Sequence, residues 1–207
     1  MSAFLGPIHY WLYNKIMLQE KIVEEILTLN EEAGFVKELD DSMVIHCGII
    51  ENQPLENMID SGNIHGWLQE KVDIVENRLS YVVTAITKEN DDRMVQILER
   101  VYQLGVEVFE SIDEKEQWTR AEGIYKILND MLLDGMPCDR VNEIISSSVD
   151  EVIYRRTRCI HETYWLEQGG FVMNYYEIRT KFVKGLLANT AFDYVADEEG
   201  NYHIRRI

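Results

Sequence analysis

The chain has 207 residues, a length typical of one globular domain. Apolar residues make up 46% of it and aromatic residues 10%, which is enough for a sizeable core and excludes a disordered protein. There are 20 Lys and Arg against 37 Asp and Glu, so the net charge is −17. A surface this negative repels phosphate backbones and anionic lipid head groups, so we expect neither nucleic-acid nor membrane binding.

The N-terminal sequence has neither the basic region nor the apolar stretch of a signal peptide. No run approaches the roughly 20 apolar residues that a membrane-spanning helix needs. The three cysteines, Cys47, Cys138 and Cys159, form no CxxC pair, and their odd number argues against a secreted disulfide framework. We therefore predict a cytoplasmic protein with reduced thiols.

Helical periodicity dominates the chain. Pro7 and Gly34 delimit the first predicted helix, and residues 35–53 are less regular, with 44–50 readable as a short strand or a buried loop. Further helices are predicted over 54–62, 63–88 with Asn63 as cap, 91–110 with Asn90 as cap, 113–133, 137–158 and 172–189. Residues 191–207 are typical of a β-hairpin about a Glu-Gly-Asn turn. We predict one all-α domain over residues 1–207, a multi-helix bundle with a small C-terminal hairpin.

Two segments of the sequence resemble each other. Residues 6–16 align without gaps to 62–72 with six of eleven positions identical, among them His9 with His65 and Trp11 with Trp67. Weaker agreement extends the repeat to 6–28 and 62–84. One interpretation is a helix-start pattern that occurs twice by chance. The other, which we favour, is two duplicated long helices that contact each other.

Four cations fall on the apolar arcs of predicted helices. Lys15 and Lys71 lie in the middle of equivalent arcs, Arg78 on the inner side of the second, and Arg156 on the stripe after Pro137 that also contains Cys159. Such side chains can extend their charged heads to water along apolar surface. If they are buried instead, each needs an anion, which is either one of the many Glu residues or a ligand.

Metal ligation is the first candidate chemistry. His9 and His65 could meet at the starts of the two helices, and His46 with Cys47 could add donors for a metal or a haem. The spacings match no known site, since there is no HxxxH and no Glu-x-x-His. The alternative is that each helix-start histidine packs or bonds to backbone. The sequence identifies no cofactor.

Thiol chemistry is the second candidate. Cys138 lies at a predicted helix N-terminus, and Cys159 follows the basic run 154–158, both settings that favour a thiolate. A catalytic dyad needs a nearby base such as His161. The alternative is an inert buried cysteine. The stripe position predicts that Cys159 is mostly buried, and the helix-start position predicts that Cys138 is the more reactive thiol.

Anion binding is the third candidate. Positive charge is concentrated in the C-terminal half, at Arg155, Arg156, Arg158, Arg179, Lys181 and Lys184. This patch could hold a carboxylate or phosphate, or close over the protein's own acids. Phosphate-binding loops and dinucleotide fingerprints are absent.

The combination favours a helical protein that binds a small anionic ligand or cofactor in a polar pocket between the duplicated helices. The expected wall comprises His9, Lys15, His65, Lys71, Arg78 and Arg156. A first alternative is a thiol- or metal-assisted hydrolase of a small acidic substrate, using Cys159 or Cys138 with His161. A second alternative is a non-enzymatic interaction module, including a homodimer.

Overall fold

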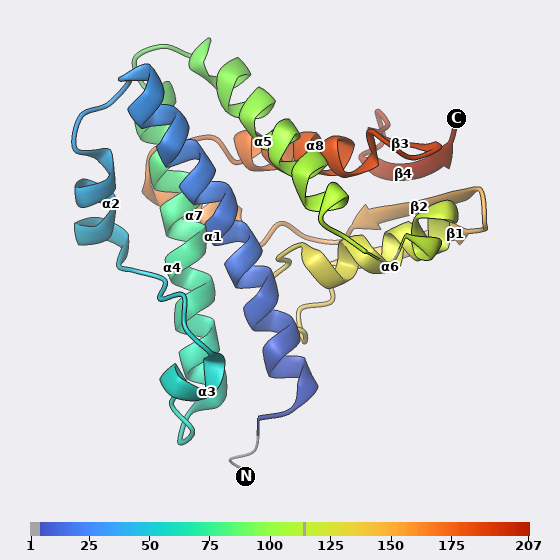
Figure 1. Ribbon diagram of the computed structural model, residues 1–207, viewed down its shortest axis with the longest axis horizontal. Coiled ribbons are helices and arrows are strands. Elements are labelled where there is room, and N and C mark those ends of the chain that lie inside the picture. The colour runs from blue at the N-terminus through green and yellow to red at the C-terminus, as the bar shows by residue number, and fades with distance from the viewer. Residues whose placement is uncertain (1–4, 114) are drawn as a thin grey trace.

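The computed structural model describes residues 5–113 and 115–207, which form eight α-helices and a four-stranded antiparallel sheet (Figure 1). The helices are α1 (Pro7–Ala33), α2 (Leu39–Cys47), α3 (Leu55–Met58), α4 (Ile64–Thr87), α5 (Arg93–Glu110), α6 (Ala121–Met131), α7 (Glu162–Glu167) and α8 (Val172–Leu187). The strands are β1 (Asn142–Ser147), β2 (Glu151–Arg156), β3 (Phe192–Ala196) and β4 (Asn201–Arg206). Residues 1–4, on which the expectation of no signal peptide partly depends, lie outside the described residues.

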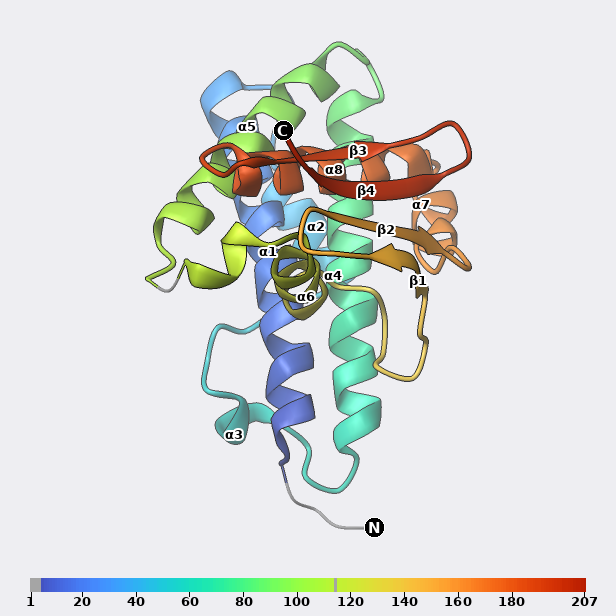
Figure 2. The same ribbon diagram turned by 90° about the vertical axis from the view of Figure 1, so that its right-hand side faces the viewer.

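The two longest helices, α1 and α4, lie side by side (Figure 1, Figure 2). Pro7 occupies the first turn of α1, Gly34 ends that helix in the left-handed conformation, and the Asn63 side chain caps α4, all as predicted. The first part of the seam between the two helices is apolar and includes Leu12, Ile16, Leu68, Val72 and Val75. The expectation of two long helices in contact is confirmed, whereas their origin by duplication stays a prediction.

A second helix pair, α5 and α8, is packed unusually closely, and in Figure 1 α5 crosses in front of α8. A Cβ atom on Gly105 would lie 2.3 Å from the carbonyl oxygen of Phe182, and one on Gly185 would lie 2.1 Å from that of Tyr102. Each glycine therefore allows the facing backbone to approach where any side chain would collide. This crossing holds α8 against the rest of the helical layer.

The sheet has the strand order β1-β2-β4-β3, and one face of it packs on α6 and α8 (Figure 2). Alternate residues point to that face, so Val152 and Tyr154 of β2 and Ile204 of β4 are buried. The Tyr154 and Tyr194 hydroxyls share a 2.7 Å hydrogen bond under the sheet. The predicted C-terminal hairpin exists as β3 and β4, but it is half of a larger sheet.

The prediction of an all-α protein is therefore wrong over residues 137–158, which form β1 and β2 instead of a helix. Val141, Ile145, Val149 and Val152 recur at helical spacing, but this segment is rich in β-branched residues, and the serines at 146–148 with Asp150 favour a hairpin turn. Pairing with β4 then supplies the other half of the ladder. The molecule is mostly helical with a small antiparallel sheet.

Two further boundaries differ from expectation. Residues 44–50 are not a strand, because α2 covers Leu39–Cys47, with Asp40 and Asp41 in its first turn where the helix dipole favours acids. The helix predicted over 113–133 is divided into a 3-10 turn (Glu116–Thr119) and α6. Among the described helices, none is both long and apolar enough to cross a membrane.

Candidate functional site: a buried charge network and a cavity

One carboxylate and two guanidinium groups meet where α6, β2 and α8 converge. Asp134, just after α6, accepts from Arg156 Nη2 at 2.5 Å and from Arg179 Nη2 at 3.0 Å, and all three side chains are at most 8% exposed. Burial by itself raises the pKa of the Asp134 carboxyl, but the two arginines outweigh it and hold the pKa well below its ordinary value. Breaking this triad strands a buried charge, so it anchors the sheet to the helices.

A histidine extends the triad toward α4. His161 is fully buried, its Nδ1 lies 3.1 Å from both oxygens of Glu76, and its Nε2 lies 3.5 Å from Arg156 Nη1. Arginine can only donate, so Nε2 accepts and Nδ1 carries the proton that it donates to Glu76. The ring also stacks on Tyr175 at 3.7 Å between centroids. Besides His161, the network contains two acids, Glu76 and Asp134, and two arginines, Arg156 and Arg179.

Arg78, predicted to bind a ligand, is paired inside the protein. Its Nε and Nη2 donate to the two oxygens of Glu20 at 2.9 and 2.6 Å, and its Nη1 donates to the Gly48 carbonyl at 2.8 Å. Both charged side chains are buried between α1 and α4. Three of its five N–H groups therefore bond inside the protein, and Glu20 already balances its charge.

Lys15 is different, because it is a buried cation without a carboxylate. The residue is 3% exposed, and no described carboxylate oxygen lies within 4 Å of its Nζ. Its neighbour is the Trp11 ring, 3.5 Å from Nζ to the centroid. Burial lowers the pKa of Lys15 from 10.5 to about 8, against the opposing pull of Asp134. Lys71, at the equivalent place in the repeat, is more exposed and pairs with Glu70 at 3.5 Å.

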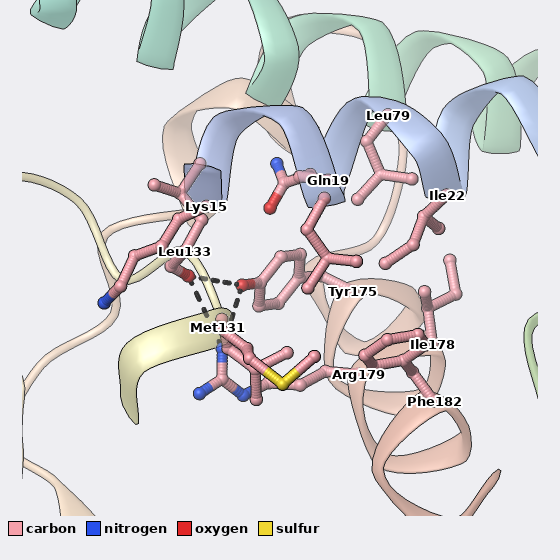
Figure 3. A pocket seen from close by; sticks show the side chains of 12 residues that line it. Lys15, Gln19, Ile22, Leu79, Met131, Leu133, Tyr175, Ile178, Arg179 and Phe182 are labelled. Atoms are coloured by element: carbon pink, nitrogen blue, oxygen red, sulfur yellow. Dashed lines mark hydrogen bonds between the residues drawn. The ribbon is translucent and has the colours of Figure 1, made fainter. Parts of the chain in front are cut away.

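A small cavity lies beside Lys15, and Figure 3 shows side chains of α1, α4, α8 and the end of α6 around it. Its free volume is about 20 Å³, where one water needs about 10–15 Å³. At one end Tyr175 donates to the Leu133 carbonyl at 3.1 Å and Arg179 lies 3.4 Å from the same oxygen. Gln19 Nε2, also at the wall, is buried without a hydrogen-bond partner. The rest of the lining is apolar: Leu18, Ile22, Leu79, Met131, Leu132, Ile178 and Phe182.

The predicted metal ligands are only partly brought together. The His9 and His65 rings lie 5.7 Å apart between centroids, but His9 Nδ1 accepts from the Gly6 N–H, the backbone bond that we gave as the alternative. His46 and Cys47 are at the end of α2, away from the starts of α1 and α4. Within residues 5–113 and 115–207 no three metal-ligating side chains lie together.

The structural reasons given for the two thiol predictions, a buried helical stripe at Cys159 and a helix N-terminus at Cys138, are both wrong. Cys159 is exposed, not buried, because the helical stripe that would bury it does not form. Its Sγ accepts from the Tyr176 hydroxyl at 3.1 Å. Cys138 is exposed but lies in a turn, so no helix dipole acts on its thiol. Both ring nitrogens of His161 are engaged elsewhere, so neither cysteine has a described hydrogen bond to it. The relative reactivity of the two thiols stays a prediction.

The basic patch of the C-terminal half closes largely over the protein's own acids. Arg156 and Arg179 share Asp134 in the interior, whereas Arg155 and Arg158 pair with acids at the surface.

Asp134, Glu76, Gln19 and Tyr175 were not predicted as site residues, and a single acid in a loop carries no local signal. No family model, curated protein or solved structure matches this chain.

Proposed function

We propose that this protein binds a small molecule bearing a carboxylate, with Lys15 as the cation that receives it. The supporting observation is the contrast among the buried cations. Arg78, Arg156 and Arg179 each have a carboxylate within 3.0 Å, while Lys15 has none among the described residues. A buried ammonium group is costly without an anion, and a ligand carboxylate supplies one.

The cavity limits what the rest of the ligand can be. Most of its wall is hydrocarbon, so a neutral or apolar substituent on the carboxylate is favoured over a second charge. Its free volume of about 20 Å³ holds little more than one water, so the ligand is small and side chains must move to admit it. Leu18 and Met131 are the half-buried residues of the apolar wall, and methionine is flexible enough to turn aside.

The proposed ligand belongs to the class expected from the sequence, but the proposed binding site lies in a different part of the molecule. The expected wall between α1 and α4 included His9, His65 and Lys71, but the first part of the seam between those helices is apolar, and farther along it Arg78 is already paired with Glu20. The supported place is the opposite side of α1, where Gln19 and the stem of Lys15 face α8 and the segment after α6, with the Lys15 ammonium group at the edge of the cavity and directed away from its centre (Figure 3). The unpartnered Gln19 amide gives a neutral donor at the cavity wall.

The test is ligand-induced stabilisation of the whole chain. Acetate, butyrate and benzoate are added to the wild type, with the corresponding neutral amides as controls. A carboxylate at about ten times its Kd should add about 1.4 kcal/mol to the free energy of unfolding, and the amides should add nothing. The stabilisation should vanish in Lys15→Met and persist in Lys21→Met, which removes an exposed lysine from the same helix. Equal stabilisation of both variants, or none of the wild type, contradicts the proposal.

A further inference from the structure

A groove on another face of the molecule is independent of the Lys15 cavity. It consists of two hollows of about 790 and 270 Å³ that share Met173 as a common wall. The larger lies between the α4–α5 turn and the start of α8, and includes Met94 and Phe171. The smaller continues past Leu98 of α5 to the β3–β4 hairpin, where Tyr202 lines it.

Large apolar side chains along this groove are exposed to solvent. Phe171 is 77% exposed and Met173 is 62% exposed. On α5, Val95 is 69% exposed and lies one helical turn before Leu98, so it extends the same apolar surface. Scattered exposed apolar residues are ordinary, but a contiguous set along a concave surface is typical of a protein-binding site.

The two ends of the groove are acidic. At the α4–α5 end, Glu89, Asp91 and Asp92 are exposed beside a single Lys88. At the hairpin end, Glu198 and Glu199 are exposed two and three residues after Ala196, which lines the smaller hollow. The smaller hollow also has Glu177 and Lys181 on its wall, one charge of each sign. A partner that fills this groove therefore meets mainly apolar side chains along its middle and a net negative charge at both ends.

We infer that this groove docks a cationic amphipathic segment of another protein, with an apolar stripe in the groove and Lys or Arg residues near both ends. Charge complementarity of this kind accelerates association and selects partners. A second copy of this chain is disfavoured as the occupant, because each copy carries a charge of −17 and two copies repel each other. Grooves between helices commonly receive an amphipathic helix in this manner.

The probes are three synthetic peptides of equal length: an amphipathic helix of leucine and lysine, the same pattern with glutamate for lysine, and a lysine peptide of equal charge without the apolar stripe. The amphipathic lysine peptide should bind the full chain, and the other two should bind at least about tenfold more weakly. Equal binding of the two lysine peptides means general attraction to an acidic protein and overturns the inference.

The apolar part of the groove is tested by the double variant Phe171→Ser with Met173→Gln. Both side chains are exposed and serine is favourable where Phe171 caps α8, so the fold should be retained. The matched control is Ile45→Gln with Ile145→Thr, two exposed apolar residues elsewhere. Binding of the amphipathic lysine peptide should weaken about tenfold in the first variant and less than about twofold in the second. Equal loss in both variants, or none in the first, overturns the inference.

The charge at one end is tested by Glu198→Gln with Glu199→Gln, against Glu24→Gln with Glu31→Gln on α1. Both pairs are exposed and change the net charge equally. Only the first pair should slow association of the amphipathic lysine peptide by more than about threefold at low salt. Equal effects of the two pairs contradict a local acidic end. A wild-type dimer that the Phe171 and Met173 variant separates would identify a second copy as the occupant and overturn the inference.

Discussion

Replacing Lys15 by methionine should stabilise the protein. The fall of the Lys15 pKa from 10.5 to about 8 corresponds to about 3 kcal/mol by which the fold disfavours the charged side chain. Methionine has a similar length and no charge, so it removes this cost and loses only the attraction of the ammonium to the Trp11 ring, about 0.5–2 kcal/mol. We expect Lys15→Met to raise the free energy of unfolding at pH 7 by about 1–3 kcal/mol, or about 2–4 °C in Tm for each kcal/mol.

The pH dependence provides an internal check on that magnitude. Below pH 8 the lysine is charged in both the folded and unfolded states, and the full cost is present. Between pH 8 and 10.5 the unfolded chain binds more protons than the folded one, so the stability of the wild type rises with pH. The advantage of Lys15→Met should therefore shrink as the pH approaches about 10. Lys21→Met, the exposed control on α1, should stay within about 0.5 kcal/mol of the wild type at every pH.

Denaturant unfolding of the three proteins at about pH 7 and pH 10 measures these differences. A loss of about 3–5 kcal/mol in Lys15→Met would mean that a carboxylate depends on the lysine and is stranded without it. A change below about 0.5 kcal/mol would mean that the ammonium reaches water. Either result refutes the reasoning that Lys15 is a buried cation without an anionic partner in the protein.

Three further substitutions test the rest of the structure. Asp134→Asn should lower the free energy of unfolding by about 3–5 kcal/mol at pH 7, because it leaves two buried arginines without their anion. The stability that the carboxylate contributes is present above its ordinary pKa and is lost as the pH falls toward its lower pKa in the folded protein. The difference in stability between the variant and the wild type, measured by urea unfolding, should therefore become smaller in acid. Gly105→Ala should lower the free energy of unfolding by about 1–3 kcal/mol, because the added Cβ collides with the backbone of α8 even though alanine favours helices, whereas Gly6→Ala, with open space around it, should not. A stabilised Gly105→Ala contradicts the close crossing. His203 lies between two carboxylates that raise its pKa, so it contributes stability that is present below about pH 6.5 and is lost as the pH rises through its raised pKa in the folded protein. His203→Gln should therefore be less stable than the wild type by about 0.5–1 kcal/mol near pH 5.5 and equally stable near pH 9. The exposed His46→Gln is the control, and a difference that does not change with pH would contradict this prediction.

The parts of the fold that were predicted correctly depend on local signals. Pro7, Gly34 and Asn63 fix helix ends through backbone geometry that involves only near neighbours, and α1 and α4 are long enough for their period to be unambiguous. The segment 137–158 failed for the opposite reason. It is short, its apolar spacing fits a helix, and although β1 and β2 pair with each other through a local turn, the next partner β4 lies about fifty residues later in the chain. The turn residues and β-branched residues were a local signal of the hairpin that the helical spacing outweighed, whereas pairing with β4 over that separation leaves no local signal.

The residues of the candidate site likewise divide into those with a local sequence signal and those without one. Lys15 was found because it interrupts the apolar arc of a long helix. Arg179 was predicted only as part of the basic patch, but the same criterion could have predicted its burial, since it shares the buried side of α8 with Tyr175, Ile178 and Phe182. Asp134 could not, because a loop residue has no periodicity and its two arginines come from a strand and a helix that meet only in the folded chain.

The proposed function depends on the state of one ammonium group, so the pKa of Lys15 is its most direct test. NMR of the protein labelled at the lysine side chains, with Lys15 assigned by its absence in Lys15→Met, gives this pKa without and with saturating benzoate. We predict a value near 8 in the free protein and a rise of at least about one pH unit when the carboxylate binds, since an adjacent anion favours the charged form. A value near 10.5 in the free protein, or one that no carboxylate changes, would contradict the proposal that Lys15 lacks a protein anion and receives one from a ligand.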